Sequence, residues 1–253
     1  RQIMSELTPV NIVCLKWGSK YPAEYVNRLY RMVRSNITRP YRFICLTEQA
    51  EGIVDGVEIR PIALDPDIRG WWYKLQLFQE QLSDISGATL FVDLDVVIVG
   101  NIDALFDYQA DAFCIIRDLQ AGKVYNSSVF RLNIGQFAHV WQDFQTDKKA
   151  IVARLHGDQD WISECIHDAQ LWPSEWVVSF KKQCQARDKR SWGVVGEWLR
   201  SKGFLQAKGE AIIPPGARIV YFHGKPDPDD VADSNYGIWK KASWIKQAWQ
   251  GEK

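Results

Sequence analysis

Short apolar runs alternate with an amphipathic segment in the first quarter of the chain. The runs at 10–17 and 41–47 are rich in β-branched and aromatic residues, which is typical of buried strands, and 57–62 predicts a third strand. Between the first two runs, residues 21–35 place apolar side chains at helical spacing on one face. Strands that alternate with helices in this way predict a parallel sheet covered by helices.

The alternation continues toward the C-terminus, although residues 181–210 show no clear period. Residues 86–101 predict a strand that turns at Gly87 and contains carboxylates. Further strands are expected at 111–118, 123–133 and 217–224, and further helices at 71–83, 134–147, 157–169 and 236–250. Because no internal repeat or low-complexity linker interrupts the chain, we predict a single α/β domain over 1–253.

The end of the chain, 237–253, predicts an amphipathic helix. Trp239, Ala242, Ile245 and Trp249 share one face, and lysines surround it. Such a helix can lie on an anionic membrane surface, or its apolar face can pack on the domain. We favour packing, because one short helix binds membranes weakly. If the helix packs on the domain, we expect the protein in the cytoplasm. If the helix binds a membrane, we expect the protein at the inner face of that membrane.

The composition narrows the class of protein. Lysine and arginine together number 31, equal to aspartate and glutamate, whereas a nucleic-acid-binding protein needs a basic excess. No apolar run reaches the roughly 18 residues of a membrane span, and the N-terminus lacks the apolar segment of a signal peptide. The five cysteines are scattered without a CxxC pair, which favours reduced thiols in a cytoplasmic protein over a zinc site.

Two carboxylates form the sharpest candidate for chemistry. Asp93 and Asp95 follow the apolar run TLFV, and strand alternation places them on one face with Leu94 on the other. Two carboxylates this close are costly without a positive partner, which is usually a divalent cation bound through oxygen. Ligands of open α/β sheets bind beyond the carboxyl ends of strands. The pair therefore predicts a metal site there, and turn-forming or surface aspartates are the alternative.

Five segments resemble, in order, the motifs of one enzyme family. WWYKLQLF resembles a T-x-K-L helix, and LFVDLDVVIVGNIDALFD resembles a DxD strand with an N-I-D-x-L-F-D continuation. YNSSVFRL resembles F-N-S-G-V, GDQDWIS resembles G-D-Q-x-x-L-N, and IVYFHGKPDP resembles a closing H-x-x-G-x-x-K-P-W. Together they resemble the GT-A glycosyltransferases, especially the family 8 group of glycogenin and the bacterial lipopolysaccharide galactosyltransferases. The residues of these segments are also similar to those of a less characterised set of bacterial glycosyltransferases.

The resemblance implies a GT-A fold, with a mixed but mainly parallel sheet flanked by helices. It implies transfer of a hexose from a nucleotide sugar of the UDP type to a glycan or lipid-linked acceptor, with retention of configuration. It also implies Mn²⁺ or Mg²⁺ bound by Asp93, Asp95 and His223. Two positions depart from the family pattern: its metal-binding histidine stands where this chain has Tyr221, and its closing tryptophan is replaced by Asp227.

The resemblance also assigns residues to the donor and to the reacting carbon. Asp158, Gln159 and Asp160 are the candidates near the anomeric carbon, either as nucleophile or as stabiliser of an oxocarbenium-like state. The implied donor-binding residues are Lys16, Trp17, Gly18, Tyr21, Lys74, Asp93, Asn126, Ser127, Gly224 and Lys225. Plain structural roles are the alternatives: solvated lysines, a strand-edge amide at Asn126, a helix cap at Asp158 and core aromatics. Of the other histidines only His156, beside GDQD, is worth testing.

The chain has 12 tryptophans, which predict either an aromatic core or surfaces that stack on flat rings. Most fall near the expected donor site or in 134–210, where we expect acceptor contacts, so we interpret them as lining the site.

Two other function classes remain open. A nucleotidyltransferase would also use carboxylates and a divalent ion, but GSKY at 18–21 is a poor phosphate loop. A non-catalytic carbohydrate-binding relative would keep the fold.

Overall fold

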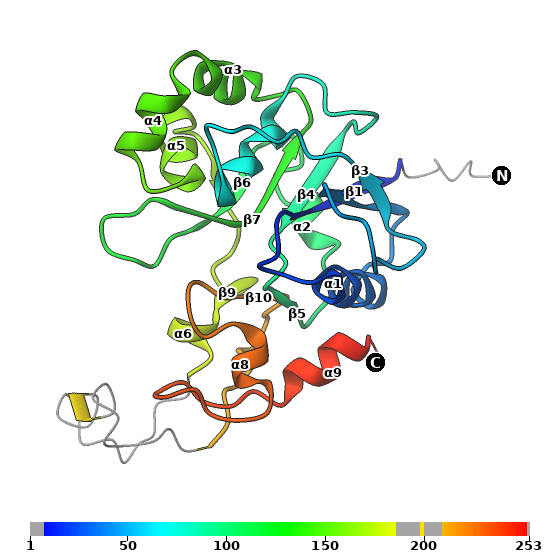
Figure 1. Cartoon of the computed structure of the whole chain (residues 1–253). Coiled ribbons are helices and arrows are strands. Elements are labelled where there is room, and N and C mark those ends of the chain that lie inside the picture. Colours follow the sequence, from blue (N-terminus) through cyan, green and yellow to red (C-terminus); the bar gives the residue numbers. More distant parts are fainter. Residues whose placement is uncertain (1–7, 186–197, 200–208, 252–253) are drawn as a thin grey trace.

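A seven-stranded mixed sheet forms the centre of the computed structural model, which describes residues 8–185, 198–199 and 209–251 (Figure 1). Its strand order is β3-β2-β1-β4-β7-β6-β8. The strands are β1 (Val10–Lys16), β2 (Tyr41–Thr47), β3 (Glu58–Arg60), β4 (Ala88–Val92), β6 (Cys114–Arg117), β7 (Tyr125–Asn133) and β8 (Gln170–Leu171). Neighbouring pairs are parallel except those of β7, which runs antiparallel to β4 and β6. The predicted α/β class and mainly parallel sheet are confirmed.

A smaller sheet has the order β5-β10-β9. It consists of β5 (Val97–Ile98), β9 (Val177–Ser179) and β10 (Ile219–Tyr221), with β10 antiparallel to β5 and parallel to β9. The single strand expected over 86–101 is therefore divided. Its first part, β4, belongs to the large sheet, and its second part, β5, pairs with β10. The turn between them contains both candidate metal-binding aspartates.

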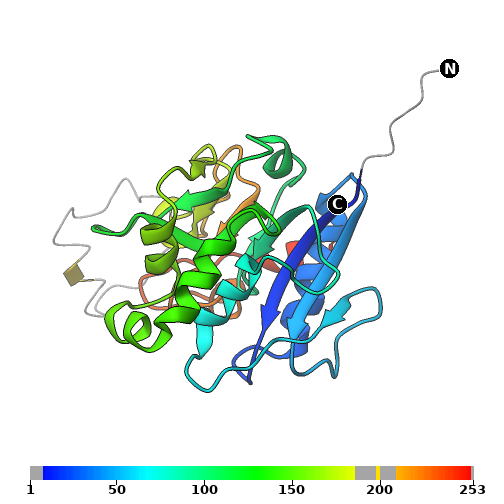
Figure 2. The ribbon, with the colours of Figure 1, turned by 90° about the horizontal axis from the view of Figure 1, so that it is seen from above.

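The helices cover the two faces of the large sheet. Two core clusters lie on opposite faces of β1, β2 and β4. On one face these strands pack against α1 (Ala23–Asn36) and α9 (Trp244–Gln250). On the other face they pack against η1 (Gly70–Phe78), α3 (Ala138–Thr146), α4 (Lys148–Arg154) and α5 (Asp158–Cys165). Figure 2 shows α1 beside the first strands and α3–α5 on the other side of the molecule. The remaining helices are α2 (Ala104–Asp107), α6 (Phe180–Gln183) and α8 (Pro228–Ala232).

Two expected helices differ from their sequence prediction. The segment expected as a helix over 71–83 is the 3-10 helix η1, which ends at Phe78. The C-terminal helix begins at Trp244 rather than at 236 or 237. The residues before it are instead paired: Tyr236 bridges Trp239, and Lys241 bridges Glu210. Backbone pairing that depends on tertiary contacts thus replaces the first turns of that helix.

Helix α9 packs against α1. Ala242 and Ile245 are fully buried, and Trp249 is 9% exposed. The guanidinium of Arg28 lies 3.8 Å from the Trp249 ring centroid, and Arg31 Nε donates a hydrogen bond of 2.9 Å to the Trp249 carbonyl. The apolar face of the helix is therefore covered by the domain, as in the packing alternative.

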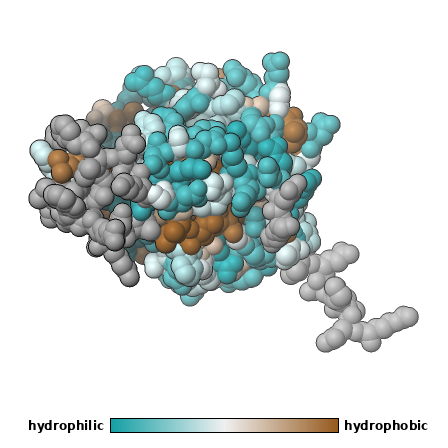
Figure 3. Space-filling view, turned by 90° about the horizontal axis from the view of Figure 1, so that it is seen from below, coloured by the Kyte–Doolittle hydropathy of each residue, from teal (hydrophilic) through white to brown (hydrophobic). Residues whose placement is uncertain are grey.

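Figure 3 shows the molecule from below, the side on which Figure 1 draws α9. This surface is largely hydrophilic, apart from an elongated hydrophobic patch that borders atoms drawn in grey. Within the described part of the chain, no helix combines the length and the apolar character needed to cross a membrane.

Candidate active site

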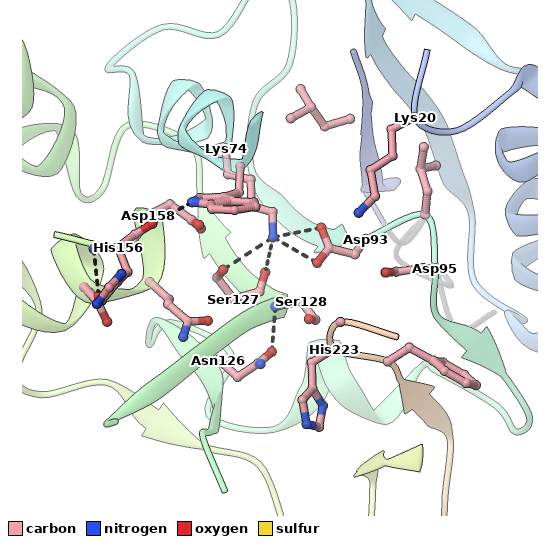
Figure 4. Close-up of a pocket in the computed structure, with 18 of the residues that line it drawn as sticks. Lys20, Lys74, Asp93, Asp95, Asn126, Ser127, Ser128, His156, Asp158 and His223 are labelled. Atoms are coloured by element: carbon pink, nitrogen blue, oxygen red, sulfur yellow. Dashed lines mark hydrogen bonds and ion pairs between the residues drawn. The ribbon is translucent and has the colours of Figure 1, made fainter. Parts of the chain in front are cut away.

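A cavity of about 420 Å³ opens where β1 and β4 end, β7 begins and α5 starts. This is the carboxyl edge at which ligands of such sheets bind. The register between β6 and β7 shifts between Ile115 and Ile116, which leaves Ser127, Ser128 and Val129 of β7 without a partner residue on β6. The cavity contains these predicted residues: Trp17, Tyr21, Lys74, Asp93, Asp95, Asn126, Ser127, Asp158, Gln159, Asp160, His223 and Gly224 (Figure 4).

Lys74 and Asp93 form a partly buried ion pair in the cavity. Lys74 Nζ lies 2.8 Å from Asp93 Oδ1 and also contacts the carbonyl and hydroxyl oxygens of Ser127 at 3.4 Å. Burial lowers the pKa of Lys74, but the negative charges of Asp93, Asp158 and Asp95 and the hydrogen bond to Asp93 together outweigh burial and raise the pKa. The backbone N–H of Asp93 donates to the Ser128 carbonyl at 2.9 Å, which joins the turn after β4 to β7.

Asp95 lies in the same turn and has a different partner. The Tyr21 hydroxyl donates to Asp95 Oδ2 at 2.9 Å. Burial raises the pKa of Asp95, and the negative charge of Asp93 raises it further. Two carboxylates that repel each other are a favourable oxygen donor set for a divalent cation.

His223 lines the same cavity, and its buried Nδ1 has no hydrogen-bond partner among the described residues. However, no group of three or more His, Cys, Asp or Glu side chains is arranged to hold a metal ion in the described residues. The two aspartates therefore fit a cation, whereas the expected set of three protein ligands is not assembled.

The three candidates at the start of α5 have different surroundings. Asp158 is 2% exposed, and its Oδ2 has no partner within the described residues. Burial raises the pKa of Asp158 to about 6, although the nearby charge of Lys74 opposes the shift. Asp160 is held by Lys123 at 2.7 Å, and Gln159 Nε2 donates to Asp118 at 3.2 Å. Asp158 is thus the one of the three with an unpaired carboxylate oxygen.

Three predicted donor residues do not line the cavity. Lys16 is buried, with Nζ 3.5 Å from the Gly18 carbonyl, and the Gly18 N–H donates to Glu48. Lys225 is exposed and forms ion pairs of 2.8 Å with both Asp227 and Asp230. Its predicted contact with a diphosphate would require these pairs to break.

Two lysines that were not predicted as site residues also line the cavity. Lys20 follows the end of β1, and its ammonium group points toward Asp93 and Asp95 (Figure 4). Lys123 lines the opposite part through its ion pair with Asp160. The signal for Lys20 was present in the segment GSKY after the first strand, but a lone lysine in a loop does not reveal its direction.

The tryptophans have mixed roles, and the interpretation that most of them line the site is wrong for the described residues. Trp17 and Trp71 line the cavity. Trp72, Trp172 and Trp249 are buried in the core, and Trp72 stacks on Phe144 with ring centroids 5.5 Å apart. Trp192 lies outside the described residues, as does part of the expected acceptor stretch 134–210. The aromatic excess therefore mainly fills the two core clusters.

No protein-family model matches this chain, and no curated protein matches it either. Solved structures do match. The galactosyltransferase LgtC, in complex with donor and acceptor sugar analogues, superposes with a TM-score of 0.60 at 15% identity, over 95% of each chain. The glycosyltransferase GlyE of Streptococcus pneumoniae TIGR4 superposes with a TM-score of 0.61 at 9% identity, over 96% of this chain and 60% of its own. The bifunctional glycosyltransferase WbbM superposes with a TM-score of 0.58 at 10% identity, over 100% of this chain and 53% of its own.

The chain has the GT-A fold. At these identities the likeness establishes the fold, so the expected GT-A architecture is confirmed. In this GT-A domain the cavity with Asp93, Asp95 and Asp158 lies at the carboxyl edge of the sheet. The activity must be argued from that site.

Proposed function

We propose that this protein is a metal-dependent glycosyltransferase that moves a hexose from a UDP-sugar to a glycan or lipid-linked acceptor with retention of configuration. One observation carries the proposal: a GT-A cavity contains a pair of carboxylates, a buried lysine and a buried unpaired carboxylate together. The structure of LgtC with donor and acceptor sugar analogues supports the same substrate classes by analogy.

Asp93 and Asp95 would hold Mn²⁺ or Mg²⁺ through oxygen, and the diphosphate and water would supply the remaining ligands. The unpartnered Nδ1 of His223 supports a supplementary role for that ring. The bound cation supplies positive charge to the diphosphate leaving group as the glycosidic bond breaks. In this proposal Lys74 orients the Asp93 carboxylate through their 2.8 Å contact.

The buried polar groups of β7 and α5 are suited to the donor sugar. Asn126 and Ser127 are 7% and 2% exposed and can donate to or accept from its hydroxyls. Asp158 is mostly ionised above its pKa of about 6 and can face positive charge on the anomeric carbon. LgtC has a glutamine in its active site, the residue changed in a Gln→Glu mutant, and Gln159 lines the cavity of this chain. Trp17 and Tyr21, at the end of β1, have flat rings suited to stack on the nucleobase.

Thermal denaturation with metal and nucleotides tests the proposal. We expect UDP with Mn²⁺ to raise the melting temperature, because a ligand that binds only the folded state stabilises it. Stabilisation by nucleoside triphosphates alone would favour a nucleotidyltransferase, and no response to any nucleotide would favour a non-catalytic carbohydrate-binding protein.

The metal assignment is tested with Asp95→Ala in the same assay. This variant should fold but lose the Mn²⁺-dependent response to UDP. Asp55→Ala is the matched control, because Asp55 is exposed in a turn and does not line the cavity. Retention of the response in Asp95→Ala would refute the assignment. A screen for hydrolysis of different UDP-sugars would then identify the donor.

A further inference from the structure

Trp71 is an exposed aromatic side chain in a fixed position. It is 54% exposed and lines the cavity from the start of η1. Its indole Nε1–H donates a hydrogen bond of 3.0 Å to the His156 carbonyl, just before α5. The ring is therefore tied at both ends, by its own backbone and by this bond. The next residue, Trp72, is 5% exposed and packs in the core, so the two neighbouring rings serve different purposes.

Gly157 provides the space for this ring. Its φ of −175° and ψ of −179° are extended, so the backbone conformation does not require glycine. A Cβ at this position would lie 2.5 Å from Trp71 Nε1 and 2.8 Å from its Cδ1. Contacts this short do not occur without movement of the ring or the backbone. The glycine is therefore needed for the close approach of Trp71.

An exposed indole is unfavourable in water unless a ligand covers it, and its flat face suits the C–H face of a pyranose. The groups suited to donor hydroxyls, Asn126, Ser127 and Asp158, are at most 7% exposed. Trp71 is by contrast open to solvent, so a second substrate can reach it. The ion pair of Lys123 and Asp160 also lines the cavity, with side chains 25% and 16% exposed, and offers polar partners for sugar hydroxyls.

We propose that Trp71, held in place by the His156 carbonyl and by Gly157, is the surface on which a pyranose ring of the acceptor stacks. This inference rests on the proposed function, because an acceptor exists only if the protein transfers sugar. Trp71 would touch the substrate directly, whereas Gly157 is a positioning residue that acts through the ring.

Saccharide binding can be measured without turnover. The methyl α- and β-glycosides of glucose, galactose, mannose and N-acetylglucosamine are titrated by saturation-transfer NMR into the full chain with UDP and Mn²⁺, and also without them. We expect at least one glycoside to bind and Trp71→Ala to weaken it about ten-fold, with Trp71→Phe intermediate. Tyr236→Ala, an exposed aromatic residue outside the cavity lining, should leave binding unchanged.

Gly157→Ala provides a second and independent test. Because it acts through the indole, it should weaken binding in the wild-type chain but add nothing in the Trp71→Ala background. Equal effects in both backgrounds would show that Gly157 acts on its neighbour Asp158 instead. Far-UV circular dichroism and melting temperature establish that each variant is folded.

Kinetics separate the acceptor from the donor. Once a donor and acceptor are known, Trp71→Ala should raise the acceptor KM about ten-fold and leave hydrolysis of the donor alone within about two-fold. Equal loss of donor hydrolysis would place Trp71 in the donor site and overturn the proposal. Unchanged saccharide binding in Trp71→Ala, or no binding by wild type, would also overturn it. If wild type lacks any response to nucleotide, the proposed function fails and the pyranose is not an acceptor. The titration without UDP then still decides whether a pyranose stacks on Trp71.

Discussion

Replacing Asp158 by asparagine should raise the stability of the protein while lowering its activity. The carboxylate is 2% exposed, and its Oδ2 lacks a partner in the described part of the chain. Burial raises its pKa from 3.8 to about 6, so the folded protein holds the proton more tightly than the unfolded chain. The ionised form therefore costs stability at neutral pH, and Asp158→Asn removes that charge with little change in shape.

The size of the effect follows from the pKa shift. A difference of about two units at about 1.4 kcal/mol per unit corresponds to about 3 kcal/mol. The new buried amide lacks a partner as well, which costs about 1–2 kcal/mol. We therefore expect the variant to be more stable by about 1–2 kcal/mol at pH 8. The advantage should shrink as the pH falls below about 6 and reverse near pH 4, because Asp158 is then protonated in the folded protein and the carboxyl of the unfolded chain is close to its own pKa of 3.8.

Urea unfolding of metal-free protein in chelator, followed from pH 4 to pH 8, measures this difference. Asp160→Asn is the matched control on the same helix. It loses an ion pair with Lys123, so it should be less stable than wild type by up to about 1 kcal/mol. A variant Asp158→Asn that is less stable than wild type at pH 8, or a difference independent of pH, would refute the reasoning. Donor hydrolysis should fall at least about 100-fold.

Three further predictions concern other parts of the molecule. Arg131→Met should destabilise the protein by about 3–5 kcal/mol in urea unfolding, because the buried guanidinium donates to five backbone carbonyls. Ile245→Ala should lower the free energy of unfolding by about 2–5 kcal/mol, since the residue is fully buried. The variant should associate with anionic liposomes as wild type does, and reduced association would favour a membrane role for α9. Lys20→Ala should weaken Mn²⁺-dependent UDP binding in calorimetry more than Lys225→Ala, because Lys225 is held by two ion pairs; the reverse order would restore Lys225 to the donor site.

Local sequence patterns sufficed for the first three strands and for helix α1. The strand expected at 41–47 is β2, and 10–17 differs from β1 by one residue, because buried parallel strands show as continuous apolar runs. The division of 86–101 into β4 and β5 was not predicted, since it depends on pairing with β10, more than 100 residues away. The late start of α9 has the same origin, in the bridge between Lys241 and Glu210.

The candidate site shows the same division. The spacing of Asp93 and Asp95 after a buried strand, and the motif that begins at Gly157, led directly to residues that line one cavity. The direction of each side chain could not be read in this way. Lys225 carried the motif but pairs with Asp227 and Asp230, whereas Lys20 carried none and points at the carboxylates.

The sequence by itself determined the class of fold, the edge of the sheet at which the candidate site lies and the identity of its carboxylates, because these depend on the order of apolar runs and on residues close in the chain. Tertiary structure decided which charges are paired, which tryptophan faces the cavity and which oxygen of α5 is left without a partner. Those properties depend on burial and on contacts between distant segments. Trp71 and Gly157 illustrate this, since they lie far apart in sequence and their contact exists only once η1 and α5 pack together.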